Sequence, residues 1–372
     1  MRGISAIEVY VLVKELQRLK GFYIDNFYEA GENRFRLRLS KSGEKVDIFC
    51  LLPYTLNVTD YIEKGEQKSN FYIAVRKRIA GARIDEVTQV NGDRIVKIAF
   101  SKGGEQGGMV FELFAKGNLL VIDGAGKISI AYRSREFKYR EIRTGKEYVP
   151  PESRGISASE ISKEKVLGLL EGKENADDGL VKSIAGMVNI GANYIENAVL
   201  SAGLDPRAKV KSVDRKSMER LAEEVLRCAE SAGSELTIYM KDGKPFDYSV
   251  CSIGKYNGLE KQRAETLSKA LDAYYHEGPA EEQDEDDETA KKIEGIRVSI
   301  ERQKDALAKM DGEVAEARAK GEEIFKNISV INSIVQSLKE NKRMTKEELQ
   351  KLFPEIKIID VDLKEKTVTI DI

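Results

Sequence analysis

An apolar heptad pattern near the end of the chain is the strongest constraint on its fold. Apolar residues from Ile293 to Leu338 occupy the a and d positions of one heptad frame, interrupted only by Gln303 and Gly321. Such spacing over more than six heptads is typical of a coiled coil. A helix of about 50 residues is roughly 75 Å long. The sequence therefore predicts an arm over residues 290–342 that is not part of a compact core.

The apolar seam of this arm needs a partner, because no second helical pattern of matching length occurs in the chain. We expect the arm to self-associate or to pair with another chain, or the sequence to be a fragment. Seven of the eight residues 281–288 are acidic, which predicts a solvated linker over 281–289. Thr345 and Glu348 then form a capping box for a short helix, and alternating segments at 356–363 and 367–372 predict a hairpin. Residues 343–372 are thus the predicted tip of the arm.

The first 151 residues predict a strand-rich α+β domain. Ser5 and Glu8 form a capping box at the start of a helix over residues 5–20. Arginines alternate with apolar residues from Arg34 to Leu39, which predicts a strand with one basic and one apolar face. Pro150-Pro151 favours an extended linker that ends the domain. A helix is expected at 69–80, further strands at 45–52, 83–90, 94–100, 109–115, 118–123 and 127–132, and turns at Asn91-Gly92, Gly103-Gly104, Gly107-Gly108 and Asp123-Gly124.

Residues 152–280 predict a second, mainly helical domain. Between residues 183 and 200, two short helices joined by a glycine turn form a helical hairpin. Backbone N–H groups at such a turn can hold a phosphate, which makes Gly186, Asn189 and Gly191 candidate contacts. A plain turn between two helices is the alternative. Residues 234–256 predict a β-hairpin with its turn at Asp242-Gly243.

The charge is distributed unevenly along the chain. Residues 1–150 contain 26 Lys/Arg and 19 Asp/Glu, whereas the remainder contains 35 and 44. A basic domain followed by an acidic one indicates an anionic partner for the first, although ordinary solubility charge gives the same counts.

Several classes of protein are disfavoured by the residues themselves. His276 is the only histidine and the three cysteines form no CxxC pair, which disfavours a His-based zinc site, a histidine-dependent triad and a disulfide framework. The chain has neither a GxxxxGK[ST] nor a GxSxG motif. No apolar run is long enough to span a membrane, and the start lacks an apolar signal core. We therefore expect a binding protein of a reducing compartment.

Five segments, taken in order, resemble one protein family. They are Ile4–Glu8 (ISAIE), Phe71–Ile84 (FYIAVRKRIAGARI), Asn91–Val96 (NGDRIV), Glu112–Asp123 (ELFAKGNLLVID) and Tyr148–Pro151 (YVPP). Together they resemble the N-terminal domain of the NFACT family, the NEMF- and RqcH-like ribosome quality-control factors, some of which are labelled fibronectin-binding. Further along, residues 183–204 are similar to the family's helix-hairpin-helix domain, and Lys320–Asn327 to its coiled-coil region.

The resemblance implies a fold and a function. The family's N-terminal domain resembles the formamidopyrimidine-DNA glycosylase fold, without known DNA cleavage. Family members bind tRNA and the large ribosomal subunit that carries a stalled peptidyl-tRNA, and they support mRNA-free tailing of the nascent chain. The resemblance thus implies a cytoplasmic tRNA- and rRNA-binding factor that is not an enzyme and has no cofactor and no metal. The family's C-terminal NFACT-R domain has no counterpart in this sequence, so we expect an N-terminal fragment.

The resemblance also implies a tRNA-binding site. The family's Asp-Arg pair corresponds to Asp93-Arg94, and a second acidic position corresponds to Glu8, where other members often carry aspartate. An arginine can grip a phosphate or stack on a base, and a neighbouring carboxylate can orient it or accept from a base amine. Basic residues of the matched segment are expected to contact phosphates: Arg76, Lys77, Arg78 and Arg83.

Simpler interpretations stay open. Asp93-Arg94 can be a hairpin turn with a surface ion pair, Glu8 a helix cap, and Arg76 to Arg78 a solvated face. A glycosylase-like DNA repair protein would begin with a proline amine followed by glutamate, but Met1 is followed here by Arg2 and a glycine. A surface fibronectin-binding adhesin would need a signal peptide or an anchor.

Overall fold

The computed structural model describes residues 1–62, 69–153, 155–172, 177–278 and 285–371, with side chains excluded for 285–299. The chain divides into two compact units, Met1–Glu282 and Gln283–Ile372. Of the predicted linker at 281–289, residues 281–284 lie outside the described residues and residues 285–289 belong to the first helix of the second unit, so the linker prediction is wrong there. Within those described ranges, every helix is too short or too polar to cross a lipid bilayer.

A nine-stranded antiparallel sheet forms the base of the first unit, as far as its residues are described. Its spatial order is β4-β3-β2-β1-β5-β6-β7-β8-β9. The β1–β4 half joins the β5–β9 half through the pair Tyr23 and Arg83. The strands are β1 (Tyr23–Gly31), β2 (Arg34–Lys41), β3 (Glu44–Leu51), β4 (Thr55–Thr59), β5 (Arg83–Gln89), β6 (Ile95–Lys102), β7 (Glu105–Glu112), β8 (Asn118–Asp123) and β9 (Ile128–Ala131).

The alternating strand at 34–39 is confirmed. The side chains of Phe35, Leu37 and Leu39 are buried in the core. On the opposite face, the Arg36 guanidinium stacks 3.9 Å from the Tyr28 ring and donates to Asp47 at 2.7 Å. The basic face is therefore largely neutralised by its neighbours.

Two strands of the nine-stranded sheet, β1 and β4, were not predicted. In β1 a bulge between Ile24 and Asn26 breaks the period of two, so Ile24 and Phe27 both face the core although they are three residues apart. In β4 the polar residues are buried because helix α7 (Leu267–Asp272) caps the edge of the sheet. The Asn57 side chain donates to Asp272 at 2.8 Å, and the Val58 N–H donates to the Ser268 hydroxyl at 3.1 Å.

The turn predicted at Gly107-Gly108 is wrong. Both glycines lie inside β7, and the turn before it is at Gly103-Gly104, where both residues have positive φ. The ring of Phe100 packs over Gly107 and leaves no room for a side chain there. Gly107 and Gly108 thus allow side chains of the neighbouring strands to pack closely over β7.

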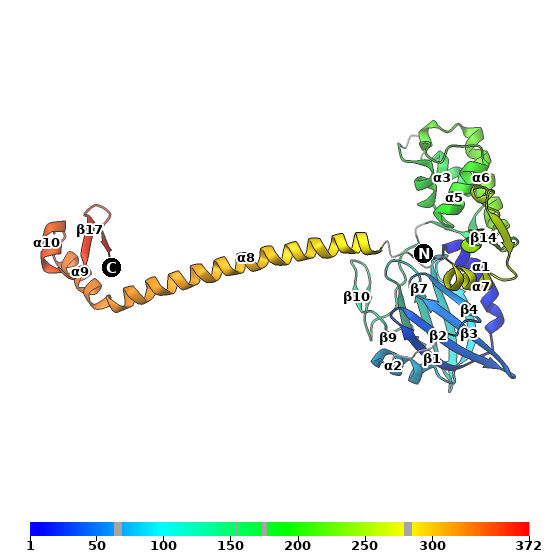
Figure 1. Cartoon of the computed structure of the whole chain (residues 1–372), viewed down its shortest axis with the longest axis horizontal. Coiled ribbons are helices and arrows are strands. Elements are labelled where there is room, and N and C mark those ends of the chain that lie inside the picture. Colours follow the sequence, from blue (N-terminus) through cyan, green and yellow to red (C-terminus); the bar gives the residue numbers. More distant parts are fainter. Residues whose placement is uncertain (63–68, 154, 173–176, 279–284, 372) are drawn as a thin grey trace. The chain divides into compact units, whose positions relative to one another are not determined.

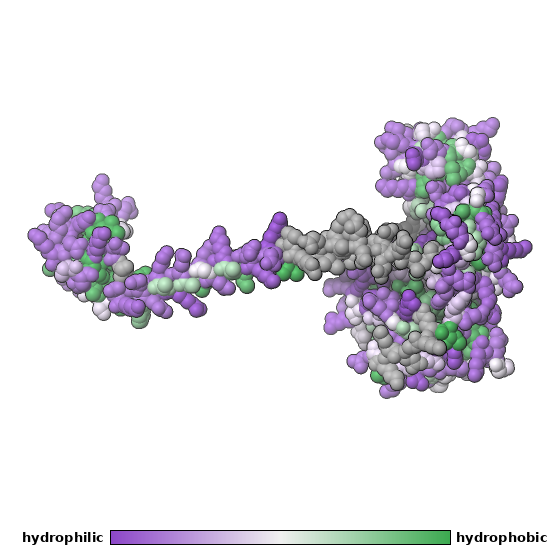
Figure 2. Space-filling model, viewed as in Figure 1, coloured by the Kyte–Doolittle hydropathy of each residue, from purple (hydrophilic) through white to green (hydrophobic). Residues whose placement is uncertain are grey.

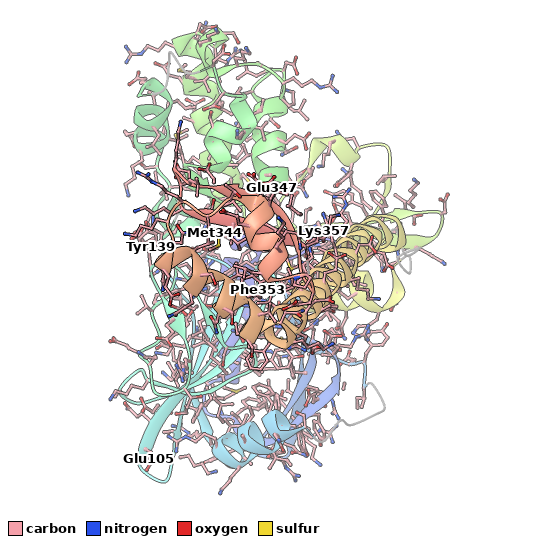
Figure 3. All side chains as sticks on the ribbon, turned by 90° about the vertical axis from the view of Figure 1, so that its left-hand side faces the viewer. Glu105, Tyr139, Met344, Glu347, Phe353 and Lys357 are labelled. Carbon is pink, nitrogen blue, oxygen red and sulfur yellow. The ribbon has the colours of Figure 1, made fainter. Side chains whose placement is uncertain are left out.

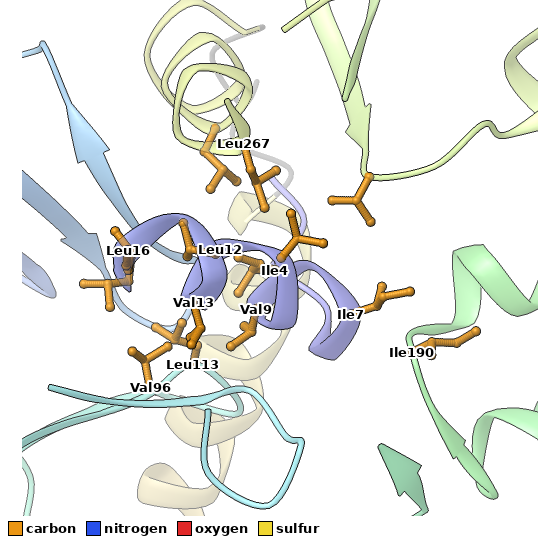
Figure 4. Close-up of a cluster of buried hydrophobic side chains, with 14 of the residues drawn as sticks. Ile4, Ile7, Val9, Leu12, Val13, Leu16, Val96, Leu113, Ile190 and Leu267 are labelled. Atoms are coloured by element: carbon orange, nitrogen blue, oxygen red, sulfur yellow. The ribbon is translucent and has the colours of Figure 1, made fainter. Parts of the chain in front are cut away.

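Helix α1 (Ala6–Leu16) lies at the centre of the first unit's core and continues into η1 (Gln17–Leu19). Its predicted capping box between Ser5 and Glu8 is present. Figure 4 shows α1 surrounded by apolar side chains from distant segments, among them Leu113, Ile190 and Leu267. This one core runs through both predicted domains, 1–151 and 152–280. Helix α2 (Asn70–Ile79) packs against β1 beside the rings of Phe27 and Phe35.

Helices gather at one end of the sheet, opposite to α2 (Figure 1). They include the predicted pair of short helices, α4 and α5, which are joined by a turn that contains β13. The elements that follow β9 are β10 (Arg135–Glu136), β11 (Glu141–Ile142), β12 (Ile156–Ser157), η2 (Ala158–Glu160), α3 (Lys163–Glu171), α4 (Leu180–Ala185), β13 (Val188–Asn189), α5 (Ala192–Ser201), η3 (Val210–Ser212) and α6 (Arg215–Glu230). A three-stranded sheet, β15-β14-β16, and a last helical stretch complete the unit. They comprise β14 (Thr237–Lys241), β15 (Lys244–Ser249), η4 (Gly254–Tyr256), β16 (Glu260–Arg263), α7 and η5 (Ala273–Glu277).

The second unit contains a long helix and a small folded tip. Its elements are α8 (Glu285–Lys326), α9 (Ile328–Glu340), α10 (Lys346–Leu352), β17 (Lys357–Asp362) and β18 (Thr367–Asp371). The capping box of Thr345 and Glu348 and the terminal hairpin are confirmed. Apolar side chains follow the described part of α8 among hydrophilic ones (Figure 2). Leu307 is 62% exposed, so the predicted seam is uncovered there within this chain.

The single helix predicted over 290–342 is interrupted at Asn327. Beyond this residue the apolar side chains serve a different contact. Ile334 of α9 is buried against Leu349 and Ile358 in the core of the tip, to which Met344 and Phe353 also contribute (Figure 3). The heptad pattern of the sequence therefore continues through α9, but in the structure the apolar face of α9 packs into the core of the tip.

Candidate functional site

A cavity of about 650 Å³ in the first unit is lined by five segments that are distant in sequence, and three of them carry the residues discussed first. These are the residues at the start of α1, the turn between β5 and β6, and the turn between α4 and α5. Asp93 and Arg94 line the cavity from the second segment, and Asn189 and Gly191 from the third. Four of the ten residues that the sequence singled out thus meet in one place.

Arg94 presents an unengaged guanidinium to this cavity. Its side chain is half-buried, and within the described residues no carboxylate or other acceptor binds it. The Asp93 Oδ1 atom accepts a hydrogen bond of 2.7 Å from the backbone N–H of Arg94, and no ion pair joins the two described side chains. Arg94 is therefore free to bind a ligand, with the Asp93 carboxylate beside it.

The turn that carries this pair is locked against the helical segment. Asn91 and Gly92 both have positive φ, as the predicted Asn-Gly hairpin turn requires. The Asn189 side chain donates to the carbonyl of Gly92 at 2.9 Å. A Cβ atom on Gly92 would lie 2.2 Å from the Cβ of Ser157, so only glycine fits. Asn189 thus positions the Asp93-Arg94 turn from across the cavity.

The N-terminus of α5 forms another wall. Its N-cap is Gly191, which has φ +108° and provides no side-chain cap, so the first amides of the helix lack the usual side-chain acceptor. A helix start of this kind carries partial positive charge and favours an anionic ligand. Glu152 also lines the cavity, so the wall carries charges of both signs. Gly186 does not line the cavity. It is the C-cap residue of α4 and has an ordinary right-handed helical backbone conformation.

Glu8 supports the cavity from behind and is fully buried. Its Oε1 accepts from Arg2 Nη2 at 2.7 Å and from the Tyr194 hydroxyl at 2.6 Å, and its Oε2 accepts from Arg2 Nη1 at 3.0 Å and from the Ser5 N–H at 2.6 Å. Burial opposes the charge of Arg2, but the Glu8 and Asp247 carboxylates outweigh it and hold the pKa of Arg2 well above its usual value. Burial also raises the pKa of Tyr194, which keeps it a donor.

The predicted basic residues of α2 lie elsewhere. Lys77 and Arg78 line a separate open groove of about 790 Å³, and α2 is at the end of the sheet opposite to α5 (Figure 1). Arg78 pairs with Glu105 at 3.0 Å, and Arg76 donates to the Tyr72 hydroxyl at 3.2 Å. Arg83, on β5, is exposed and lies 3.8 Å from Asp85. The sequence-predicted residues therefore do not form a single surface.

The family model for the NFACT N-terminal and middle domains matches residues 5–370. The chain belongs to the NFACT family. The match includes the start of α1, the Asp93-Arg94 turn, the helical pair and nearly all of the second unit.

Relatives of this NFACT chain are named for ribosome quality control. It is 24% identical over 357 residues to the archaeal Rqc2 homolog aRqcH of Methanocaldococcus jannaschii, which covers 91% of this chain and 52% of the relative. It is 22% identical over 363 residues to the human ribosome quality control complex subunit NEMF, covering 89% of the chain and 33% of the relative. The chain thus spans about half or less of the length of these relatives.

Solved structures share the fold. The fibrinogen binding protein from Staphylococcus aureus matches with a TM-score of 0.60 and 17% identity, covering 73% of this chain and 98% of that one. The N-terminal part of the fibronectin/fibrinogen-binding protein from Streptococcus suis matches with a TM-score of 0.59 and 19% identity, covering 73% and 99%. At this identity the likeness concerns the fold alone.

Arg2 is one of the cavity residues that sequence reasoning missed in this NFACT chain. It lines the cavity and joins α1 to the β14–β15 hairpin, because its Nε donates to Asp247 at 2.6 Å and its guanidinium stacks 3.9 Å from the Tyr248 ring. Its partners Asp247 and Tyr248 are about 245 residues away in sequence. The local signal was an arginine just before a helix whose third position is a glutamate, which is too common a pattern to identify such a role.

Proposed function

We propose that this chain binds tRNA and the large ribosomal subunit in ribosome-associated quality control, and supports mRNA-free tailing of stalled nascent chains. The names of its relatives support a role in ribosome quality control. The cavity around Asp93 and Arg94 supports RNA as the ligand. The tailing function, the ribosomal partner and a cytoplasmic location rest on the family, whose described members are longer than this chain.

The unengaged guanidinium of Arg94, held in a formed cavity beside the start of α5, is the observation that carries the proposal. A guanidinium is suited to grip a phosphate or to bind the edge of a guanine, and a helix N-terminus attracts a phosphate. The neighbouring carboxylate of Asp93 is suited to accept from a base amine. A site with both signs of charge favours a nucleotide that presents a base as well as a phosphate.

The remaining predicted residues fit supporting roles in this proposal. Asn189 and Gly191 shape the cavity, through the hydrogen bond to Gly92 and the uncapped helix start. Glu8 holds Arg2 and Tyr194 in place. The α2 groove with Lys77 supplies phosphate contacts that carry no sequence information. We propose binding and positioning, without catalysis by this chain.

Sequencing of the RNA that co-purifies with the chromosomally tagged protein tests this function. The wild type is expected to enrich a discrete set of tRNAs together with large-subunit rRNA. Arg94→Ala is expected to lose the tRNA set. Arg215→Ala, which removes an exposed arginine of α6, is the matched control and should retain it. No tRNA above the level of an untagged strain would refute the proposal.

A further inference from the structure

The small hairpin of β10 and β11 carries a strongly exposed aromatic ring. Tyr139 is 83% exposed, the largest exposure among the large apolar side chains of the described residues (Figure 3). Phe137, two residues earlier, is 42% exposed. Apolar rings left in water on a folded domain indicate a binding surface when they occur together.

The hairpin holds these rings out on a fixed support. The Phe137 N–H donates to the Arg140 carbonyl at 2.9 Å, which closes the turn that contains Tyr139. The Arg140 guanidinium is buried against Glu112 at 2.5 Å, and the Tyr148 hydroxyl donates to the same carboxylate at 3.2 Å. A rigid support lowers the entropy that is lost when a ligand binds.

Basic side chains alternate with the rings. Residues 133–143 (RSREFKYREIR) contain five Lys/Arg and two Glu. The Lys138 ammonium lies 5.1 Å from the Tyr139 ring, and the Arg140 guanidinium lies 4.7 Å from the Phe137 ring. Within the described residues, Lys138 and Arg135 form no ion pair. Exposed rings interleaved with free cations suit a strand of unpaired nucleotides, whose bases stack and whose phosphates need counter-charges.

The hairpin adjoins the cavity described above. Phe114 and Ala115 line both that cavity and a small hollow beneath the hairpin, which Phe137 and Arg140 also line. The Arg140 guanidinium lies 6.0 Å from the Phe114 ring. A nucleotide strand that leaves the cavity therefore reaches the hairpin by crossing Phe114 and Ala115.

We propose that the β10–β11 hairpin is a stacking platform for unpaired RNA nucleotides, next to the nucleotide held by Arg94. Tyr139 supplies the exposed ring, and Arg135 and Lys138 hold the flanking phosphates. The platform rests on the RNA-binding function proposed above and adds a contact that favours single-stranded over double-stranded RNA, because bases in a duplex are already stacked. A protein partner is disfavoured, since the rings stand among cations and not within a broad apolar patch.

Binding of a single-stranded RNA of about ten nucleotides that contains 2-aminopurine, and of the same sequence as a duplex, tests the platform in the whole chain. Tyr139→Ala is expected to weaken single-strand binding by roughly 5-fold to 100-fold and to abolish quenching of the 2-aminopurine. Its affinity for the duplex should stay within about twofold of the wild type. Tyr139→Phe keeps the ring and should bind like the wild type. Phe246→Ala is the matched control, because Phe246 is also exposed with a lysine 5.5 Å from its ring.

The outcomes separate this inference from the proposed function. Wild-type binding that Tyr139→Ala leaves unchanged overturns the platform, whereas loss of binding in Arg94→Ala in the same assay still supports the cavity. An equal loss in Tyr139→Phe or in Phe246→Ala also overturns the platform. A wild-type chain that binds neither RNA also overturns the platform, whereas tRNA among the RNA that co-purifies with it would still support the proposed function.

Discussion

Arg2 and Glu8 form a bidentate ion pair, with Nη2 to Oε1 at 2.7 Å and Nη1 to Oε2 at 3.0 Å. The pair fixes the residues before α1 as a wall of the cavity. All four contacts of the Glu8 carboxylate are made within the protein, so this residue acts on a ligand through the shape of the site. The acidic position that the family resemblance assigned to tRNA use is thus proposed to be a positioning residue.

Glu8→Ala is expected to destabilise the protein. Removing one partner of a buried ion pair leaves the other charge uncompensated, which costs about 3 kcal/mol even though Asp247 still contacts Arg2. Urea unfolding followed by circular dichroism measures the change. Asp93→Ala is the control and should alter the free energy of unfolding by less than about 0.5 kcal/mol, since its side chain bonds only its neighbour's amide. A Glu8→Ala protein of normal stability that fails to bind tRNA would instead indicate direct contact.

Two glycines of the helical turn should respond differently to alanine. Gly191 has φ +108°, and an added Cβ would lie 2.7 Å from the Cβ of Ser5, so Gly191→Ala should cost about 2 kcal/mol or more. Gly186 has ordinary helical φ and no contact closer than 3.5 Å, so Gly186→Ala should be nearly neutral. Thermal unfolding of the two variants compares them directly. Equal melting temperatures would contradict the tight approach of α5 to the start of α1.

Local sequence signals predicted local structure well. The capping boxes at Ser5 and Thr345 and the alternation at 34–39 depend on neighbouring residues only, and the structure contains all three. Strand β1 was missed because its bulge breaks the alternation, whereas strand β4 depends on distant partners. Strand β4 is stabilised by the side chains of Ser268 and Asp272, which no local pattern contains.

The candidate site shows the same limit. The resemblance singled out Asp93-Arg94, and the glycine turn singled out Asn189 and Gly191, yet nothing in the sequence indicated that they share a cavity. That arrangement depends on the hydrogen bond from Asn189 to Gly92, which joins residues 97 positions apart. Tyr139 was also missed, because exposure is a property of the folded hairpin.

The α2 surface should contribute salt-dependent affinity. Changing Arg76, Lys77 and Arg78 together to alanine is expected to weaken binding to all tRNAs and to flatten the slope of log affinity against log salt. Each lost phosphate contact lowers the slope by about 0.7 to 0.9. The decrease in the salt slope should be smaller than that expected for three lost phosphate contacts, because Arg78 already pairs with Glu105. Lys209→Ala with Lys211→Ala, which removes lysines that pair with Asp177, is the control. An unchanged slope in the triple variant would exclude α2 from the interface.

The uncovered seam of α8 should make the protein self-associate. Leu307, Met310 and Val314 are each more than half exposed on one helix face, which is more apolar surface than isolated helices usually leave in water. Sedimentation velocity over a range of concentrations should show a rising average mass. Replacing these three residues by serine should abolish the rise. Replacing three exposed polar residues of the same helix, Lys309, Glu313 and Glu316, should preserve it. A wild-type monomer at every concentration would refute self-association.

The Asp93-Arg94 pair should control which tRNA is bound. Asp93→Ala removes a negative charge, so electrostatics alone predicts that binding to non-cognate RNA holds or rises. If Asp93 accepts from a base amine, the ratio of cognate to non-cognate affinity should fall by about tenfold, within the range of one lost base contact. Arg94→Ala should reduce the same ratio and also weaken binding overall, because its guanidinium has no other partner in the described structure.

Titrations of a cognate and a non-cognate tRNA at two salt concentrations distinguish these effects, with the cognate chosen from the RNA that co-purifies with the wild type. A selective contact lowers the affinity ratio at both salts, whereas a phosphate contact changes the salt slope and leaves the ratio alone. Asn189→Ala provides an independent test in the same titrations. It removes the bond to Gly92 without touching the cavity charges, so it should lower the ratio through loss of position alone. If both Asp93→Ala and Arg94→Ala keep the wild-type ratio, the pair is only a hairpin turn that happens to face a cavity.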